Sequence, residues 1–227
     1  MPAIALDKVC LALTSRAGPV DILKNVDLRI DPGETVGIVG PSGSGKSSLL
    51  MVAAGLERAT SGQVVVAGQD ITATGEDARA ALRARAIGIV FQSFHLMPTM
   101  TARENVALPL ELAGVDGAEA RADAALAEVG LAARLEHYPA ELSGGEQQRV
   151  AIARAIVGAP RILFADEPTG NLDQRTGVEV MDLLMRLGAE RGTTLVLVTH
   201  DAALAARCRR RITLGDGRIV ADERAPA

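Results

Sequence analysis

The stretch Gly40-Pro-Ser-Gly-Ser-Gly-Lys-Ser47 decides the fold, because it matches the phosphate-binding loop pattern G-x-x-x-x-G-K-[ST]. Its glycines let the backbone curl, so that successive N–H groups point at phosphate oxygens. Lys46 can then reach the β- and γ-phosphates, and the Ser47 hydroxyl can ligate Mg²⁺. The residues expected to contact phosphate here are Gly40, Pro41, Ser42, Gly43, Ser44, Gly45, Lys46, Ser47 and Ser48. We therefore expect this chain to bind a nucleoside triphosphate.

The residues on both sides of this loop support that interpretation. Residues 34–39 (Glu-Thr-Val-Gly-Ile-Val) are typical of a short buried strand, and residues 48–55 have a helical pattern. A helix that begins directly after the loop directs its N-terminus at a bound anion. The alternative, a plain Gly/Ser-rich turn, requires neither the strand before the loop nor the helix after it.

Composition limits the class of protein. The 227 residues are enough for one α/β domain with a helical subdomain, and 48% apolar content with 2% aromatic content indicates an aliphatic core. The net charge of −4 argues against a generic nucleic-acid binder, so we expect no nucleic-acid partner. The basic run 207–211 is the exception, and we interpret it as a solvated patch before a strand.

Nothing in the sequence predicts a membrane span or secretion. No window holds about 18 consecutive apolar residues, and the N-terminus lacks the basic and apolar segments of a secretory signal. Cys10 and Cys208 have no metal-ligand spacing and are expected to be buried free thiols. We therefore expect a soluble, cytoplasmic chain that contacts a membrane only through a partner.

The pattern of apolar residues divides a single domain, 1–227, into parts. Strand-like runs dominate 1–92 and 160–222, helical segments dominate 93–159, and 223–227 is expected to be a tail. The fold class is α/β, with an antiparallel β subdomain and an inserted α-helical subdomain. Strands are expected at 4–13, 26–30, 34–39, 63–67, 87–91, 161–165, 194–198, 211–214 and 218–221, and helices at 48–55, 76–85, 102–112, 118–129, 131–136, 146–157, 174–190 and 202–208.

A second acidic site follows the strand at 161–165. The run Ile162-Leu-Phe-Ala-Asp-Glu167 delivers two adjacent carboxylates at a carboxyl strand end, where α/β sheets place their ligands. Side chains alternate along a strand, so the two carboxylates serve different roles. The hypothesis is that Asp166 holds Mg²⁺ and that Glu167 polarises the attacking water. An acidic turn alone is common, but one that follows a phosphate loop indicates hydrolysis.

The third stretch is Leu142-Ser-Gly-Gly-Glu-Gln-Gln-Arg149. Ser143 and Glu146 have the S-x-x-E spacing of a capping box, which predicts the start of a helix. Gly144 and Gly145 in the first turn leave backbone N–H groups uncovered, as in an anion-binding helix terminus. The sequence therefore predicts a second phosphate site.

Taken together and in this order, these motifs resemble the ATP-binding subunit of ABC transporters over nearly the whole chain. The resemblance adds Gln92 as the Q-loop glutamine, the D-loop run Asn171-Leu-Asp173, and His200 as the switch histidine. It implies a P-loop NTPase core, a mixed sheet with helices. It also implies ATP and Mg²⁺ as cofactors, with ATP hydrolysis as the activity.

The resemblance explains the second phosphate site. In this family two subunits pack about a two-fold axis, and the signature of one copy closes over the ATP of the other. Catalytic roles are implied for Glu167, His200 and Lys46. Further nucleotide contacts are implied for Gln92, Ser143, Gly144, Gly145, Glu146 and Asp173, and metal contacts for Ser47, Gln92 and Asp166.

Residues 88–109 and 165–173 resemble more narrowly the subgroup that contains LolD, MacB, FtsE and YbbA, with 76–85 and 140–154 most similar to YbbA. That resemblance implies a separate permease with a large periplasmic domain, and an ATPase on the cytoplasmic face of the bacterial inner membrane. The implied cargo is a hydrophobic or lipid-linked substrate that is exported or extracted. The alternative is an FtsE-like ATPase that remodels the cell envelope without transport.

One departure from the family concerns adenine. Many family members stack adenine on an aromatic residue upstream of the phosphate loop, but no aromatic occurs here before Phe91, and Ser15 falls near the expected position. We therefore expect phosphates and Mg²⁺ to supply most of the binding energy. Discrimination between ATP and GTP should then stay below about a hundredfold, roughly 2.7 kcal/mol.

Overall fold

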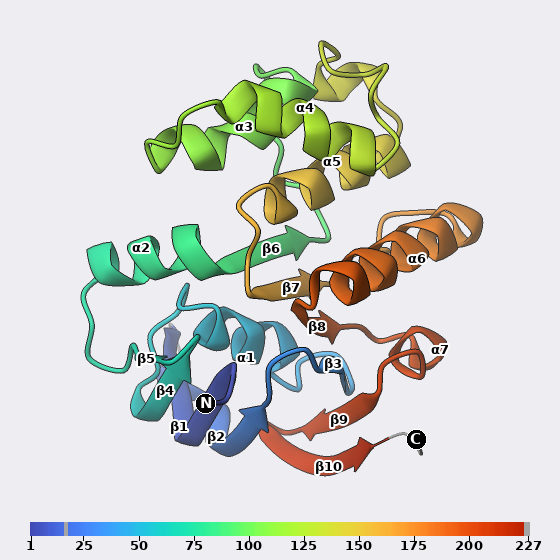
Figure 1. The fold of residues 1–227 in the computed structure, drawn as a ribbon. Coiled ribbons are helices and arrows are strands. Elements are labelled where there is room, and N and C mark those ends of the chain that lie inside the picture. The colour runs from blue at the N-terminus through green and yellow to red at the C-terminus, as the bar shows by residue number, and fades with distance from the viewer. Residues whose placement is uncertain (16–17, 225–227) are drawn as a thin grey trace.

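The computed structural model describes residues 1–15 and 18–224, which form two sheets and a separate layer of helices (Figure 1). The smaller sheet is antiparallel, with strand order β2-β1-β4-β5, and the larger has the order β10-β9-β3-β8-β7-β6. The strands are β1 Ile4–Ser15, β2 Gly18–Ile30, β3 Thr35–Val39, β4 Ser61–Val66, β5 Gln69–Asp70, β6 Ile87–Phe91, β7 Ile162–Asp166, β8 Thr194–Val198, β9 Arg210–Gly215 and β10 Arg218–Arg224. The helices are α1 Lys46–Ala53, α2 Glu76–Ala86, α3 Ala102–Leu112, α4 Ala118–Glu128, the 3₁₀ turn η1 Pro139–Glu141, α5 Gly144–Ile156, α6 Gln174–Arg191 and α7 Ala202–Ala205.

The larger sheet is mixed, because β10 pairs antiparallel with β9 while the other strands run parallel. Its central strand β8 is buried at every position, and its sequence Thr-Leu-Val-Leu-Val is a continuous run without polar alternation. Such runs are typical of parallel strands that are covered on both faces. The expected α/β class with a mixed sheet is thus confirmed.

Alternation along β7 shows how the two faces are covered. Ile162 and Phe164 join a core with the antiparallel sheet and α1, whereas Leu163 and Ala165 join a second core with α3, α4, α5 and α6. Burial of a side chain of the size of Ile162, Leu163 or Phe164 contributes about 1.5–3 kcal/mol. The sheet therefore holds the phosphate-loop side and the helical layer (α3, α4 and α5) on opposite faces.

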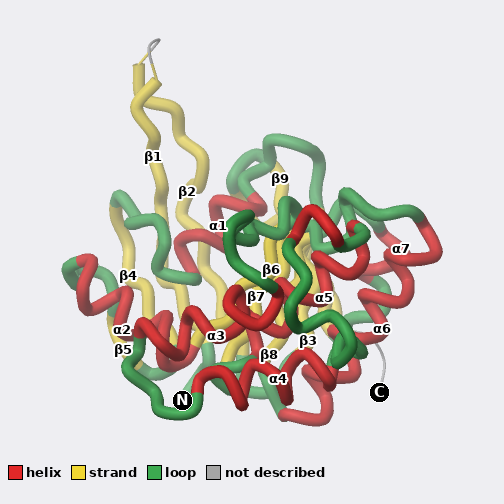
Figure 2. The backbone as a smooth tube through the Cα atoms, turned by 90° about the horizontal axis from the view of Figure 1, so that it is seen from above, coloured by secondary structure: helices red, strands yellow, loops and turns green. Residues whose placement is uncertain are grey.

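The β1–β2 hairpin is longer than the sequence pattern predicts, and it projects from the body as a ribbon (Figure 2). We expected strands at 4–13 and 26–30, but β2 begins at Gly18. Register shifts and the positive φ of Lys8 and Asn25 interrupt the polar–apolar alternation on which the prediction depended. Pro19 is tolerated because β2 is an edge strand.

The helix expected at 131–136 is wrong. Gly130, with φ of +80°, ends α4, and the following residues form two turns, with hydrogen bonds from Arg134 N to Leu131 O and from His137 N to Arg134 O. The carbonyls of Leu135 and His137 instead accept the first two free N–H groups of α3. This tertiary pairing replaces the bonds that a local helix would have made.

The C-terminal tail is shorter than the expected 223–227, because Glu223 and Arg224 belong to β10 and pair with Arg211 and Arg210 of β9. Residues 225–227 lie outside the described residues. Helix α7 also ends early, at Ala205 rather than at 208. Across the described ranges, no helix is long and apolar enough to cross a membrane.

Candidate functional site

The phosphate loop connects the end of β3 to the start of α1, at the carboxyl edge of the larger sheet. Gly40, Gly43 and Gly45 have φ values of 152°, 78° and 98°, which lie in the region that favours glycine. A Cβ on Gly40 would lie 2.1 Å from the main-chain oxygen of Leu214, so no other residue fits there. The loop shape is therefore fixed by its glycines and by the neighbouring strand β9.

The loop has the features of a phosphate cradle. Helix α1 has no side chain that caps its N-terminal N–H groups, so these remain available to an anion. Ser44 Oγ is buried and has no hydrogen-bond partner among the described residues. Lys46 is also buried, and its Nζ donates to the oxygens of Gly40 (3.0 Å) and Pro41 (2.9 Å). The ammonium thus lies over the loop, where a triphosphate would need it.

Ser47 and Asp166, the expected metal contacts, lie side by side. Ser47 Oγ donates to Asp166 Oδ1 at 3.0 Å across 119 residues of sequence. Burial raises the pKa of Asp166, and the hydrogen bond from Ser47 opposes this rise. A hydroxyl and one carboxylate fit Mg²⁺, which is commonly held by one or two carboxylates and substrate phosphates. Within residues 1–15 and 18–224 no cluster of three or more His, Cys, Asp or Glu forms a separate metal site.

Glu167 and His200 form a pair next to this site. The ends of β7 and β8 are neighbours, and His200 Nδ1 lies 2.9 Å from Glu167 Oε2. The Glu167 side chain is 17% exposed, whereas that of His200 is 74% exposed. Glu167 has a φ of +46°, a conformation that is unusual outside glycine and is often found at functional sites. Two of the three residues with expected catalytic roles, Glu167 and His200, are thus brought together.

Gln92 lies at the end of β6, and Phe91 before it is paired with Asp166. Its side chain is bonded to Asn171 rather than to Ser47 or Asp166: Gln92 Nε2 donates to Asn171 Oδ1 at 3.1 Å. Asn171 Nδ2 donates in turn to the main-chain oxygen of Gln92 at 3.0 Å. Asn171 lies in the expected D-loop run, but the sequence does not predict this contact, because no local pattern links residues 79 positions apart.

The signature residues form the expected capping box at the start of α5. Ser143 Oγ accepts from Glu146 N at 3.2 Å, and the Glu146 carboxylate accepts from Ser143 N at 2.9 Å. The backbone hydrogen bond from Ser143 and the ion pair with Arg134 lower the pKa of Glu146. A Cβ on Gly145 would lie 2.5 Å from Thr176 Cγ2, which explains the glycine there. Ser143 and Gly144 are exposed.

Asp173, the last expected contact, caps α6. Its Oδ1 accepts from Thr176 N at 3.1 Å, and the hydrogen bonds from Thr176 lower the pKa of Asp173. This carboxylate therefore has a structural task at the helix N-terminus. Its expected contact with a nucleotide stays a prediction.

The signature and the phosphate loop lie apart in one chain. Helix α5 belongs to the helical layer on one face of the larger sheet, while α1 lies on the other face (Figure 1). No hydrogen bond between described residues joins 143–146 to 40–48. Within one chain the signature and the phosphate loop therefore do not form a common site.

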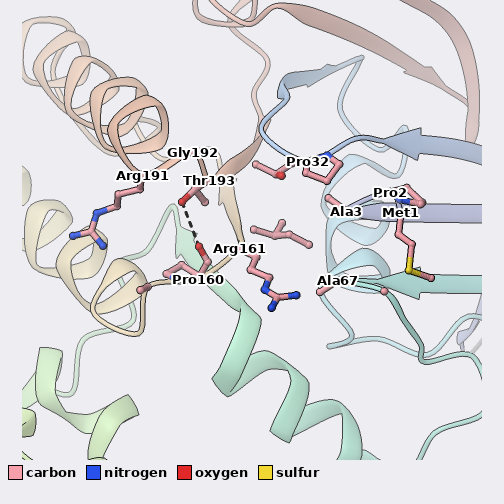
Figure 3. Close-up of a pocket in the computed structure, with 14 residues that line it drawn as sticks. Met1, Pro2, Ala3, Pro32, Ala67, Pro160, Arg161, Arg191, Gly192 and Thr193 are labelled. Carbon is pink, nitrogen blue, oxygen red and sulfur yellow. Dashed lines mark hydrogen bonds between the residues drawn. The ribbon is translucent and has the colours of Figure 1, made fainter.

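A cavity of about 460 Å³ lies elsewhere, at the amino ends of the sheet strands (Figure 3). Its lining includes Arg161 and Thr193, which precede β7 and β8, together with Pro32 before β3 and the N-terminal Met1. None of the phosphate-loop residues lines it. It is therefore distinct from the site described above.

A sequence model for the family described as "ABC transporter" matches residues 23–170. The chain belongs to the ABC transporter family. It is 55% identical over 202 residues to the "Uncharacterized ABC transporter ATP-binding protein YbbA" of Escherichia coli K12, covering 88% of this chain and 89% of that protein. It is 54% identical over 205 residues to the "Lipoprotein-releasing system ATP-binding protein LolD" of Geobacter metallireducens, covering 89% and 91%.

A solved ABC cassette has the same fold. The structure titled "Dimeric structure of a post-hydrolysis state of the ATP-binding cassette MJ0796 bound to ADP and Pi" superposes with a TM-score of 0.91 at 40% identity, covering 99% of each chain. The expected resemblance to this ABC subgroup is therefore confirmed, and so is the P-loop NTPase fold. The chain is an ATPase of the ABC family.

Proposed function

We propose that this ABC ATPase dimerises when it binds ATP and uses hydrolysis to drive a separate permease of the bacterial inner membrane. The observation that carries the proposal is the arrangement at the carboxyl edge of the larger sheet. The Glu167–His200 pair stands at 2.9 Å beside the Ser47–Asp166 pair at 3.0 Å. The first pair suits a water-activating base, and the second suits a metal-nucleotide complex.

The residues of this chain divide the work of hydrolysis. The loop N–H groups and Lys46 bind and orient the phosphates. Ser47 and Asp166 would hold Mg²⁺, which would neutralise the charge that develops on the phosphates. Glu167 accepts a proton from the attacking water. His200 fixes the Glu167 carboxylate through their hydrogen bond. Its side chain is 74% exposed, so it would also be able to contact the γ-phosphate.

A second copy completes the enclosure. Ser143 and Gly144 are exposed on the helical layer, and the loop that they would cover lies on the other face of the sheet. A two-fold dimer would place the signature of each copy over the ATP of the other, forming two equivalent sites. The dimeric structure of MJ0796, which has the same fold, supports this arrangement.

We assign the contact with the permease to the helical unit 93–159, and the nucleotide-binding core to residues 1–92 and 160–222. Met97 and Leu96 follow the Gln92 loop in an apolar run, and Met97 is 44% exposed. Such a patch suits a protein partner with an apolar docking helix. Because the relative LolD is named for lipoprotein release, we propose a hydrophobic or lipid-linked cargo and a permease with a large periplasmic domain. The chain would then sit on the cytoplasmic face of the membrane.

Separate measurements of ATP hydrolysis and of ATP binding distinguish the role of Glu167 from that of the phosphate-binding residues. Glu167→Gln should lower kcat by at least about a hundredfold and leave the affinity for ATP within about threefold, because the amide keeps the shape but cannot accept a proton. The control Glu190→Gln lies on an exposed ion pair of α6 and should behave like the parent. An active Glu167→Gln protein would remove Glu167 from the role of base.

The partner is tested by isolating the chain from membranes of its own host with an affinity tag. The expected result is co-purification of an integral membrane protein with a large periplasmic domain, whose presence changes ATP turnover. Recovery of a partner that carries no cargo and acts on the cell envelope would favour the FtsE-like alternative and contradict transport.

A further inference from the structure

The Gln92 side chain lies on two residues of the loop that follows β7, Gly170 and Asn171. The Gln92 amide and the Asn171 amide exchange two hydrogen bonds, from Gln92 Nε2 to Asn171 Oδ1 and from Asn171 Nδ2 to the main-chain oxygen of Gln92. The loops after the neighbouring strands β6 and β7 are thereby tied together. The proposed function does not use this pair.

The two bonds determine which atom of each amide faces which partner. The main-chain oxygen of Gln92 can only accept, so Asn171 must direct its NH₂ group at it. The Oδ1 of Asn171 is then the atom that faces the Gln92 side chain, and it requires the Gln92 Nε2. The Gln92 Oε1 is left over, and no described residue bonds it.

Gly170 gives the amide the space that it occupies. A Cβ at Gly170 would lie 2.7 Å from Gln92 Nε2 and 3.0 Å from its Cδ. The φ of Gly170 is not positive, so its backbone does not require glycine. The contact with the flexible end of Gln92 is therefore the feature that an added methyl group would disturb.

We infer that Asn171 and Gly170 are positioning residues that hold Gln92 with its Oε1 as the free atom. A side-chain oxygen is the ligand that Mg²⁺ or its bound water requires, whereas an NH₂ group would repel the cation. In the sheet, Phe91 pairs with Asp166, the proposed metal contact. Gln92, which carries the free Oε1, is the next residue after Phe91. The inference rests on the proposed function, because it needs ATP and Mg²⁺ beside Asp166.

The test measures ATP binding without turnover, in full-length Glu167→Gln protein, with and without Mg²⁺. In that background Asn171→Leu and Gly170→Ala should each reduce the Mg²⁺-dependent gain in ATP affinity by about tenfold, roughly 1.4 kcal/mol, and leave Mg²⁺-free binding unchanged. Gly158→Ala is the matched control, because its Cβ would meet only Ala84 O at 3.8 Å. Gly170→Ala keeps the test valid if Asn171→Leu folds poorly.

A double-mutant cycle shows whether Asn171 acts through Gln92. Gln92→Ala should lose the same Mg²⁺-dependent gain, and adding Asn171→Leu to it should lose nothing more. A full gain in both Asn171→Leu and Gly170→Ala, equal losses with and without Mg²⁺, or additive losses in the double variant would each overturn the inference. Failure of the Glu167→Gln parent to bind ATP would instead overturn the proposed function, and the inference with it.

Discussion

Single residues of the site show both what a sequence can predict and what it cannot. The phosphate loop, Asp166 and Glu167 were identified from local patterns, because their chemistry depends on neighbours in sequence. The hydrogen bonds Ser47–Asp166 and Gln92–Asn171 span 119 and 79 positions. Only the order of strands in the sheet brings such residues together. The Ser47–Asp166 contact could be expected, because a phosphate loop and a later acidic strand end form a known pair of motifs. The Gln92–Asn171 contact could not be expected.

Asp166 is expected to limit the stability of the nucleotide-free protein. Burial raises its folded-state pKa, so between the ordinary aspartate pKa of about 4 and that higher value the folded state binds more protons than the unfolded state. The free energy of unfolding therefore falls as pH rises through this window, and the loss is complete above it. Asp166→Asn should raise the thermal midpoint at neutral pH, with the difference from the parent vanishing below pH 4.

The same variant should lose at least about a hundredfold in ATP hydrolysis, since a metal contact is removed. Asp182→Asn, on an exposed ion pair of α6, is the control and should change neither quantity appreciably. A lower thermal midpoint for Asp166→Asn at neutral pH would show that the buried Asp166 carboxylate does not destabilise the folded protein.

At the scale of elements, helix starts were predicted well and one short helix was not. The helix expected at 146–157 begins two residues earlier, at Gly144, directly after the Ser143 of the predicted capping box, because capping depends on residues three apart. The expected helix at 131–136 is absent, because α3 takes the carbonyls of Leu135 and His137. Local propensity is a weak guide where tertiary hydrogen bonds compete.

A comparison of two helices with the same kind of cap can distinguish the structural role of Ser143 from its proposed role in a dimer. Thr101 caps α3 with the same capping box that Ser143 makes on α5. Ser143→Ala and Thr101→Ala should each lower the free energy of unfolding by about 1 kcal/mol in urea denaturation. Only Ser143→Ala should also reduce ATP-dependent dimerisation. An equal loss of dimerisation in Thr101→Ala would show that helix stability alone is responsible.

Arg154 of α5 connects the signature helix to the loop after β6. Its guanidinium donates to the main-chain oxygens of Phe94 (2.7 Å) and His95 (2.6 Å), two successive residues with φ of +57° and +50°. Burial lowers the pKa of Arg154, so the two hydrogen bonds must compensate for a desolvated charge.

Removing that guanidinium should release the strained backbone. Arg154→Ala is expected to lower the free energy of unfolding by about 2–3 kcal/mol and to increase amide hydrogen exchange at residues 94–97. Arg175→Ala, whose side chain is 91% exposed, should stay within about 0.5 kcal/mol of the parent. Unchanged amide hydrogen exchange in Arg154→Ala would show that the loop holds its shape without the two hydrogen bonds from Arg154.

At the scale of the whole molecule, one chain carries the signature and the phosphate loop on different layers, which we propose to be two halves of an ATP site. The α/β class and the inserted helices could be predicted from the change in apolar periodicity at about residue 93. The distance between signature and loop could not, because it follows from which face of the larger sheet each helix covers. In the proposed dimer, a second copy would bring the signature to the loop. Aliphatic core clusters of Val, Leu and Ile hold the two layers in place.

The proposed ATP-dependent dimer is tested by the mass of the Glu167→Gln protein in solution, measured by light scattering with and without Mg-ATP. We predict the mass of one chain, 23.6 kDa, without nucleotide and twice that mass with Mg-ATP. Adding Ser143→Arg, which places a bulky cation at the exposed signature, should keep the protein at the mass of one chain. A Glu167→Gln protein that binds Mg-ATP and remains at 23.6 kDa would contradict the account.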